Sequence, residues 1–559
     1  MEKVRTTIYS VPKYNTYEYI IKNAWSVRII YVSALISWCF AVLGFVRFLN
    51  LNNWYWVIFG PVLAFFTVYQ FISYYINLFY ESFDLVRHHR FVNSFWSDTK
   101  KLPTVDIFLP ICGEETAVLK RTFQSASEIE YSAKNIYVLD DQGNEEHKAL
   151  ASECNFTYLS RENKGYMNKA GNLKYGFEHS HGEFLVIFDA DFAPHKDFIK
   201  QTLPYMQDPR TAIVQTPQYF ESTKIIHERS SLEYGAGQVQ EDFYRIIQVA
   251  RDHFGGAVCV GSNAMYRRSA LLEIGGTAQI EHSEDIHTGF KLLLKNWKIK
   301  YIPLILAIGL CTDNMHAYFH QQHRWCTGTL SLINDTFWLS KVPFGIKLSY
   351  FSGFLYYLSF AFEIVLTFQI FLLLIWHYNF INFQNTLVFL PSLFILFIVM
   401  PLFRRSRTRF GTLITRTAYA NSYLHAVFSA LAKKTLPWAP TGTKSSKVSN
   451  AYTEGFIFNA GYILIYVLLT AFLIATKHFP LFNFNYWFVL FWIFYFLATR
   501  LILLINSFEV YQEIKLESLS NTLHSQSIYR VWWLKTMGSY LGTLVFIIAI
   551  AILYSSHVR

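Results

Sequence analysis

Long apolar segments on both sides of a more polar middle place the strongest constraint on the fold of this 559-residue chain. A run of about 20 apolar residues is long enough to cross the hydrocarbon core of a bilayer as a helix. Seven segments meet this criterion, at roughly 28–48, 54–79, 350–376, 386–403, 456–476, 486–506 and 535–554. The sequence therefore predicts about seven transmembrane helices, two before the middle segment and five after it.

Basic residues flank these spans on one side. They are Lys3, Arg5, Lys13, Lys22, Arg87, Arg90, Lys100, Arg404, Arg405, Arg407 and Arg409. Loops 377–385 and 477–485, on the other side, carry almost no Lys or Arg. Because positive loops remain in the cytoplasm, we expect a multi-pass protein of the plasma (inner) membrane with a cytoplasmic middle segment. The net charge of +10 therefore fits a protein whose partner is a lipid bilayer. Nucleic acid is not expected as a partner.

The middle segment, 103–335, alternates short β-branched runs with helix-like runs. The expected strands are 105–109, 136–139, 184–188 and 212–215, and the expected helices are 115–127, 169–180 and 196–206. This alternation is typical of a layered α/β domain with a mostly parallel sheet. Ligands of such sheets bind beyond the carboxyl ends of the strands.

The predicted organisation has eight parts. They are 1–27, a cytoplasmic segment; 28–80, two transmembrane helices; 81–345, the α/β domain; 346–404, two transmembrane helices; 405–455, a cytoplasmic interface segment; 456–506, two transmembrane helices; 507–534, an amphipathic interfacial segment; and 535–559, the last transmembrane helix and tail.

Carboxylates follow two of the expected strands. Asp189 and Asp191 come directly after the strand 184–188, and hard oxygen ligands of this kind suit Mg²⁺ or Mn²⁺ held together with substrate phosphates. Asp140 and Asp141 follow another strand and could hold a nucleoside by hydrogen bonds. A polar turn after a strand is the alternative explanation for each pair taken alone.

Three further charged side chains lie at expected helix starts. Lys169 could neutralise phosphate with the help of a helix N-terminus. Glu284 and Asp285 precede a helical run, and Asp285 is the candidate general base for an acceptor hydroxyl. The alternative is a helix cap, because Ser283 is a favourable N-cap residue and acids favour the first helical turn.

Gln321, Arg324 and Trp325 have the most specific spacing. At i, i+3 and i+4 they share one face of a helix. Arg324 can clamp a diphosphate through its planar guanidinium, and Trp325 can offer a ring face to a sugar. The alternative is an interfacial Trp and Arg anchor beside the membrane.

In order, these motifs resemble those of the processive family-2 glycosyltransferases, which include cellulose, hyaluronan and chitin synthases. Three aspartate motifs are followed by Gln321-Gln-His-Arg324-Trp325, and the context Ser283-Glu-Asp285-Ile-His-Thr-Gly289 is closest to the cellulose-synthase-like branch. The resemblance implies a GT-A, Rossmann-like domain between transmembrane helices. It also implies UDP-glucose as donor and a growing polysaccharide as product.

The resemblance further implies roles for single residues. Asp140 would contact the uridine, Lys169 would support nucleotide binding, and Asp189 and Asp191 would lie at the diphosphate and metal. Asp285 would be the base, while Gln321, Arg324 and Trp325 would form the acceptor and diphosphate platform. The segment 438–444 has the position of the family's gating loop, in which Thr441 or Lys444 would touch the nucleotide.

The chain also departs from cellulose synthases. The first strand loop reads Pro110-Ile-Cys-Gly-Glu114, so base stacking is not expected at Cys112, whereas Glu114 is retained as a substrate-binding candidate. Two spans rather than four precede the catalytic domain, and no cyclic-di-GMP-binding domain is expected after the last span. A β-1,3 linkage therefore stays open beside β-1,4.

Several alternatives remain at this stage. The donor could be another UDP-sugar, as in a hyaluronan- or chitin-like synthase, or the chain could add single sugars to a lipid. From a different class, the chain could be a transporter subunit without enzymatic activity. A homo-oligomer and accessory subunits are both left open by the sequence.

Overall fold

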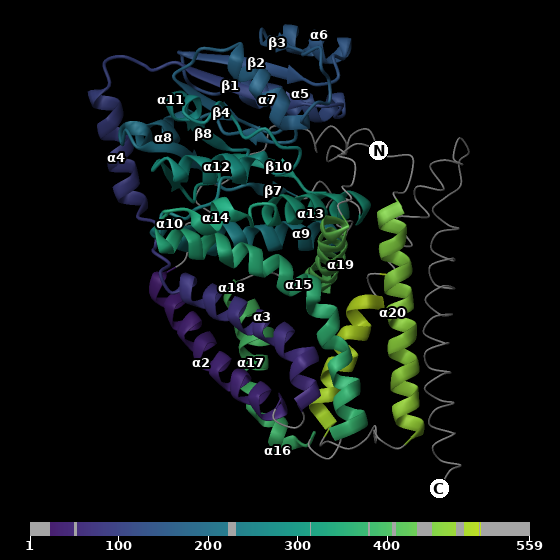
Figure 1. Ribbon diagram of the computed structural model, residues 1–559. Coiled ribbons are helices and arrows are strands. Elements are labelled where there is room, and N and C mark those ends of the chain that lie inside the picture. The colour runs from purple at the N-terminus through teal and green to yellow at the C-terminus, as the bar shows by residue number, and fades with distance from the viewer. Residues whose placement is uncertain are drawn as a thin grey trace.

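The computed structural model describes residues 23–49, 53–221, 231–312, 315–377, 381–404, 410–432, 450–476, 486–501 and 504. A seven-stranded sheet with the order β3-β2-β1-β4-β8-β6-β9 forms the centre of the middle segment (Figure 1). Its strands are β1 (Val105–Ile111), β2 (Lys134–Asp140), β3 (Thr157–Leu159), β4 (Phe184–Ile187), β6 (Thr211–Gln215), β8 (Ala264–Arg267) and β9 (Lys298–Tyr301). Only β8 runs antiparallel to its neighbours β4 and β6.

The sheet is buried on both faces. Along β1, Ile107 and Leu109 pack into one hydrophobic cluster, while Phe108 points into another on the opposite face. The surrounding helices of this domain are α4 (Leu85–Asp98), α5 (Thr116–Ser127), α6 (Glu145–Glu153), α7 (Asn168–Glu178), α8 (Phe198–Thr202), α9 (Ser231–Asp242), α10 (Gln248–His253), α11 (Arg268–Leu272) and α12 (Glu284–Leu294). The strands and helices expected from the sequence are confirmed, except that the run 196–206 is divided into α8 and the 3-10 turn Leu203–Gln207.

A second sheet of three short strands has the order β5-β10-β7. The strands are β5 (Ala193–Pro194), β7 (Tyr219–Glu221) and β10 (Ala307–Leu310). Because β5 begins two residues after Asp191, this small sheet fixes the segment that follows the carboxyl end of β4.

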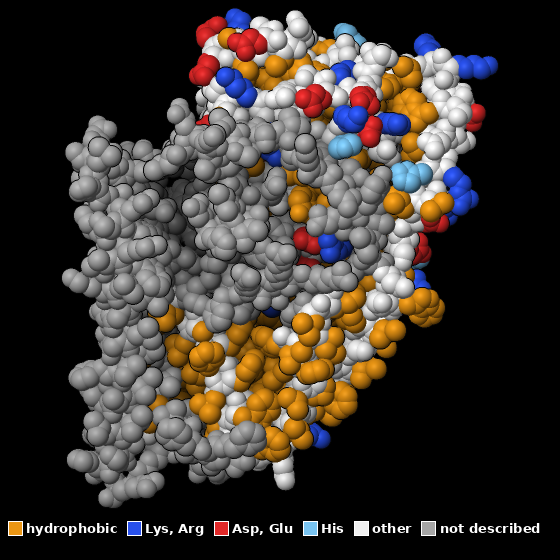
Figure 2. Space-filling model, turned by 180° about the vertical axis from the view of Figure 1, so that it is seen from behind, with side chains coloured by type: hydrophobic (Ala, Val, Ile, Leu, Met, Phe, Trp, Pro, Cys, Tyr) orange, Lys and Arg blue, Asp and Glu red, His pale blue; other side chains and the backbone are white. Residues whose placement is uncertain are grey.

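Apolar helices lie below the α/β domain in Figure 1. They are α2 (Ala24–Leu49), α3 (Asn53–Asn77), α15 (Phe344–His377), α16 (Phe383–Thr386), α17 (Leu390–Phe394), α18 (Met400–Arg404), α19 (Phe410–Leu431), α20 (Asn450–Ala475) and the helix Trp487–Leu501. Figure 2 shows that hydrophobic side chains gather on this lower part of the molecule, whereas charged side chains gather on the α/β domain. The two helices α13 (Met315–Leu330) and α14 (Asp335–Leu339) lie between these parts.

The expectation of seven spans is not supported. Within the described ranges, the segment Ala24–Phe48 alone is both long and apolar enough to cross a membrane. The expected span 386–403 is interrupted by the 3-10 turn Leu387–Phe389 and the π-helical turn Ile395–Val399, and the apolar helices Asn459–Ala475 and Trp487–Leu501 are shorter than a span. The expected segments 507–534 and 535–554 lie outside the described residues.

Candidate active site

One cavity of about 1040 Å³ brings most of the predicted site residues together. Its wall contains Glu114, Asp141, Lys169, Asp189, Asp191, Glu284, Asp285, Gln321, Arg324 and Trp325. These residues come from the carboxyl ends of β1, β2 and β4, the first turns of α7 and α12, and the helix α13. The site therefore lies where an α/β sheet with parallel strands binds its ligands. Thr441 and Lys444 lie outside the described residues.

Lys169 joins two of the acidic groups. In the first turn of α7, its Nζ forms an ion pair with Asp189 and lies 3.7 Å from Glu284 Oε1. Nζ also donates to the Gly261 carbonyl at 3.2 Å. Burial lowers the pKa of Lys169, but Asp189 and Glu284 act against burial and hold the pKa above its ordinary value. Lys169 is therefore a fixed positive charge at the carboxyl end of β4.

Asp191 and Glu114 are two further acidic side chains in the cavity wall. Burial, followed by the charge of Asp189, raises the pKa of Asp191 to about 7. Burial also raises the pKa of Glu114 to about 7, although the backbone N–H of Cys112 donates to Glu114 Oε2 at 2.6 Å. Each of these carboxyl groups therefore favours its neutral form unless a cation lies beside it.

Asp285 lies in the first turn of α12 at the cavity wall. Burial, followed by the charge of Glu284, raises its pKa to about 7, while Lys169 acts in the opposite direction. The capping alternative is not seen for Ser283, since this residue is left-handed at φ 55° and its side chain makes no capping hydrogen bond. The turn instead directs Asp285 towards Gly261, whose missing side chain leaves room. A Cβ at Gly261 would lie 2.9 Å from that of Asp285.

Gln321, Arg324 and Trp325 all lie on α13 and line the cavity, as their spacing predicted. Burial lowers the pKa of Arg324, while the charges of Glu284, Asp189, Asp285 and Asp191 raise it. The guanidinium of Arg324 thus lies within electrostatic reach of these four carboxylates.

The two aspartates after β2 have different positions. Asp140 is fully buried and outside the cavity wall, and its carboxylate accepts hydrogen bonds from Gln142 N (2.8 Å), Asn144 N (2.9 Å) and Tyr158 Oη (2.7 Å). Asp140 therefore stabilises the turn that follows β2. Direct contact of Asp140 with a nucleoside stays a prediction. Asp141 reaches the cavity.

Asp141 is held by Arg161, a residue that the sequence motifs did not include. Arg161 donates from Nε and Nη2 to the two carboxylate oxygens at 2.5 and 2.9 Å, and both side chains are buried. It also donates to the carbonyls of Tyr166 (2.6 Å) and Asn168 (3.1 Å). Arg161 consequently joins the end of β2 to the segment that leads into α7, whose first turn carries Lys169. No spacing rule pointed to it, because its partner is 20 residues away along the chain.

Replacing Arg161 by Met is expected to lower the free energy of unfolding by about 3–5 kcal/mol, because it leaves the buried Asp141 carboxylate without its partner. Urea-induced unfolding of the detergent-solubilised protein would measure the change. Lys174→Met is the matched control, since Lys174 pairs with Glu178 at 3.9 Å on the exposed face of α7 and such pairs contribute under about 1 kcal/mol. Equal effects of the two substitutions would contradict a positioning role for Arg161.

Comparison with known proteins agrees with this geometry. Residues 106–275 match the model of glycosyl transferase family 2. The chain is 29% identical over 327 residues to the cellulose synthase 1 catalytic subunit [UDP-forming] of Komagataeibacter xylinus, which is 58% of this chain and 43% of that protein. It is 31% identical over 235 residues to the cellulose synthase catalytic subunit [UDP-forming] of Xanthomonas axonopodis pv. citri, 42% of this chain and 32% of the relative.

The chain thus spans less than half the length of these relatives. Among solved structures, a mannosyltransferase from Pyrobaculum calidifontis in complex with GDP-Man and Mn²⁺ is 15% identical to this chain, with a TM-score of 0.47. The match covers 68% of this chain and 100% of the mannosyltransferase chain. A likeness at that TM-score supports no argument about the site.

The sheet, the acidic cavity and the matched segment together define a glycosyltransferase with a GT-A α/β domain. Residues 106–275 form a family 2 glycosyltransferase domain, and the chain is related over part of its length to the catalytic subunits of bacterial cellulose synthases. The predicted enzyme class is confirmed.

Proposed function

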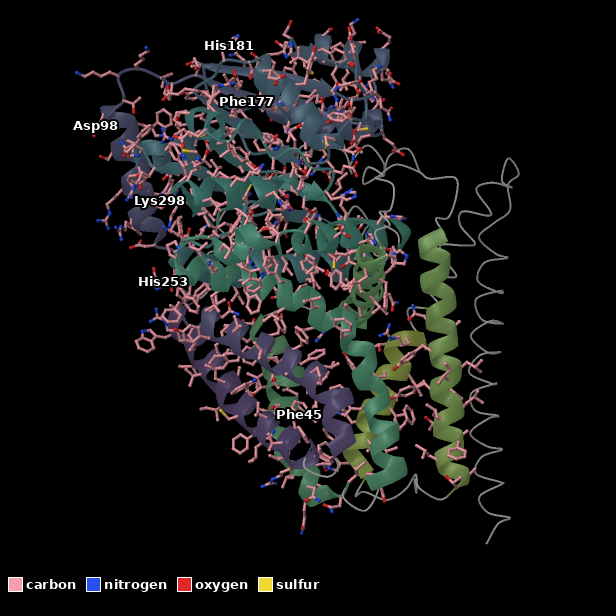
Figure 3. All side chains as sticks on the ribbon, viewed as in Figure 1. Phe45, Asp98, Phe177, His181, His253 and Lys298 are labelled. Atoms are coloured by element: carbon pink, nitrogen blue, oxygen red, sulfur yellow. The ribbon has the colours of Figure 1, made fainter. Side chains whose placement is uncertain are left out.

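We propose that this chain is a processive, inverting β-glucosyltransferase. It polymerises glucose from UDP-glucose into a β-1,4- or β-1,3-glucan and moves the product across the membrane. The observation that carries the proposal is that the cavity with the acidic cluster continues between the apolar helices. Phe45, which Figure 3 labels among those helices, lines the same cavity as Asp285.

The extension of the cavity suits a sugar chain. Its wall carries aromatic side chains from α3, α15, α19 and the helix Trp487–Leu501, among them Tyr69, Tyr356, Tyr419, Tyr423, Trp492 and Phe496. Rings of this kind offer flat apolar faces to sugar rings, and tyrosine hydroxyls can pair with sugar hydroxyls. A transferase that releases its product after one addition would not need such a path, which favours processive synthesis.

The residues of the cavity can carry out an inverting transfer. Asp285 accepts the proton of the acceptor hydroxyl as that oxygen bonds to C1 of glucose and the bond from C1 to the phosphate oxygen breaks. Lys169 and Arg324 bind the negative charge that develops on the departing UDP. Trp325 and Gln321 orient the acceptor sugar, and Glu284 helps to fix Lys169. Nucleotide contacts by Asp140, Thr441 and Lys444 remain predictions within this scheme.

Asp189 and Asp191 fit a divalent metal by the chemistry of their donor atoms. Across the described residues there is no group of three or more His, Cys, Asp or Glu side chains that could hold a metal on its own. Two carboxylates therefore suit Mg²⁺ or Mn²⁺, ions that take their other ligands from water and phosphates. When bound, such an ion would neutralise charge on the diphosphate.

Chelation with EDTA is expected to abolish sugar transfer, and added Mn²⁺ or Mg²⁺ is expected to restore it. Asp191→Asn should lower transfer at saturating Mn²⁺ by at least about 100-fold, since the metal contributes several kcal/mol to stabilising the leaving charge. Asp208→Asn, on an exposed turn, is the matched control and should keep the wild-type rate. Undiminished transfer after chelation would exclude the metal role.

The membrane part of the proposal rests on α2, on the exposed apolar side chains of the neighbouring helices and on the relation to cellulose synthases. We propose a multi-pass protein of the plasma (inner) membrane with a cytoplasmic α/β domain. A homo-oligomer or accessory subunits are compatible with it.

The proposal is tested by sugar incorporation with purified, detergent-solubilised protein. Labelled UDP-glucose, UDP-GlcNAc and UDP-glucuronate are offered singly and as the GlcNAc–glucuronate pair, with Mg²⁺ or Mn²⁺. A high-molecular-weight product from UDP-glucose alone supports a glucan synthase, and linkage-specific glucanases then identify the bond. A product only from the pair would replace the proposal by a hyaluronan-like synthase.

A further inference from the structure

The segment 258–262, between the end of α10 and the start of β8, touches two residues of the proposed transfer site. The carbonyl of Gly261 accepts a hydrogen bond from Lys169 Nζ at 3.2 Å. A Cβ at Gly261 would lie 2.9 Å from the Cβ of Asp285 and 3.0 Å from its Oδ2, so no side chain fits between the two residues. The place of this segment therefore sets how the Asp285 carboxylate and the Lys169 ammonium lie relative to each other.

Side-chain amides hold this segment, which forms neither a helix nor a strand. Val258 N donates to Gln248 Oε1 at 3.0 Å, and Gln248 Nε2 donates to the Val258 carbonyl at 2.7 Å. Val260 N donates to Gln215 Oε1 at 3.0 Å, and Gln215 Nε2 donates to the Ser262 carbonyl at 2.8 Å. Each amide thus uses one donor and one acceptor on alternate residues of the segment, as a neighbouring strand would.

A third amide completes the support. Gln218 Nε2 donates to the Val260 carbonyl at 3.1 Å, while its Oε1 accepts from Tyr244 Oη at 2.9 Å. We call Gln215, Gln218 and Gln248 the glutamine cluster, and all three side chains are buried. Because a buried backbone N–H or carbonyl without a partner is costly, the segment is held where these amides can reach it.

We infer that the glutamine cluster positions the transfer site. It fixes the segment that contains Gly261, and through Gly261 it sets the places of Asp285 and Lys169. The inference rests on the proposed function, which gives those two residues their roles, and it deepens that function by adding positioning residues that no sequence motif contains. Gln215 and Gln248 are not among the residues that line the cavity, so they act through the segment rather than on the substrate.

Gln215→Met tests the inference, because it keeps the length of the side chain and removes its hydrogen bonds to the segment. Turnover of sugar transfer should fall by about 100-fold, since a displacement of about 1 Å at the reacting groups has an effect of this size. Turnover is measured with the purified full-length protein in detergent and with the donor that the wild type incorporates. Wild-type turnover in Gln215→Met would overturn the inference.

The pH profile separates positioning from a general loss of structure. Wild-type turnover should rise through about pH 7, because burial raises the pKa of Asp285 to about 7. In Gln215→Met the rise should move to lower pH, since a displaced segment admits water to this carboxylate. Lys169 keeps its ion pairs with Asp189 and Glu284, so burial is the cause that changes. Reduced turnover with an unchanged pH profile would overturn the inference.

Gln201→Met is the matched control. Gln201 lies on α8, is not among the residues that line the cavity, and accepts or donates at 2.7 Å to Nε2 of the buried His88. Its turnover and pH profile should equal those of the wild type. If Gln215→Met does not fold, Gln218→Met removes a single bond to the segment and should lower turnover severalfold with the same shift of the pH profile. An unchanged profile in Gln218→Met would then overturn the inference.

Transfer by the wild-type protein distinguishes this inference from the function on which it rests. If the wild type forms polymer from UDP-glucose and the variants of the glutamine cluster do so with the same turnover and pH profile, the positioning role alone is refuted. If the wild type transfers sugar from no donor, the proposed function is refuted, and the positioning role with it.

Discussion

Replacing Asp285 by Asn is expected to lower the turnover of sugar transfer by about 1000-fold. The amide is nearly isosteric with the carboxylate but cannot accept the proton of the acceptor hydroxyl, and a positioned general base contributes about 100- to 10,000-fold. Asp285 suits this role, because burial and the charge of Glu284 raise its pKa to about 7. A base with a pKa near the working pH transfers protons most effectively.

Two measurements distinguish this role from a structural one. Turnover of the wild-type protein should rise with pH through about 7, because Asp285 must lose its proton before it can act as a base. UDP affinity should change by less than about threefold in Asp285→Asn, since a base contributes to the transition state rather than to ground-state binding. Glu178→Gln, an exposed position on α7, serves as control. A variant that keeps even a tenth of the wild-type turnover would rule out Asp285 as the base.

Much of the site was predictable because it depends on local patterns. The runs 105–109 and 184–188 are continuously apolar, as expected of strands buried on both faces, and they are β1 and β4 in the structure. Polar residues after such strands reach one edge of the sheet, which brought Asp189 and Asp191 into the cavity. The helical spacing of Gln321, Arg324 and Trp325 fixed a common face in the same way.

Contacts between distant segments were not predictable from these patterns. Arg161 follows β3 without any motif, and its importance depends on the fold that brings it to Asp141. Gly261 is required because Asp285 approaches it, and it adopts φ +75°, a conformation that favours glycine. Ser283 suggested a helix cap, but its left-handed backbone directs its side chain away from that role.

The predicted number of membrane spans is not supported by the described residues, for a related reason. Mean hydropathy registers apolar side chains but not the continuity of a helix. The segment 386–403 is mostly apolar, yet its helix contains the 3-10 turn Leu387–Phe389 and the π-helical turn Ile395–Val399. The apolar helix Phe383–Val399 is shorter than a span and packs against α2.

Replacing Arg324 by Lys is expected to lower turnover by about 100- to 1000-fold, although the positive charge is retained. Loss of one preorganised donor to a developing oxyanion costs about this much, and an ammonium cannot make the paired, planar contacts of a guanidinium. Arg324 is within electrostatic reach of Glu284, Asp189, Asp285 and Asp191, so its charge is held at the acidic cluster. Steady-state transfer from UDP-glucose would measure the effect.

The comparison with Arg324→Gln separates charge from geometry. If charge alone mattered, Arg324→Lys would retain most of the wild-type turnover and only Arg324→Gln would lose it. If the guanidinium positions the departing diphosphate, both variants lose turnover by similar factors, whereas the exposed control Arg210→Lys does not. The second pattern is expected, because Lys169 already supplies an ammonium at the carboxyl end of β4. In the proposed mechanism, Arg324 adds a planar donor on α13 that would contact the same phosphates.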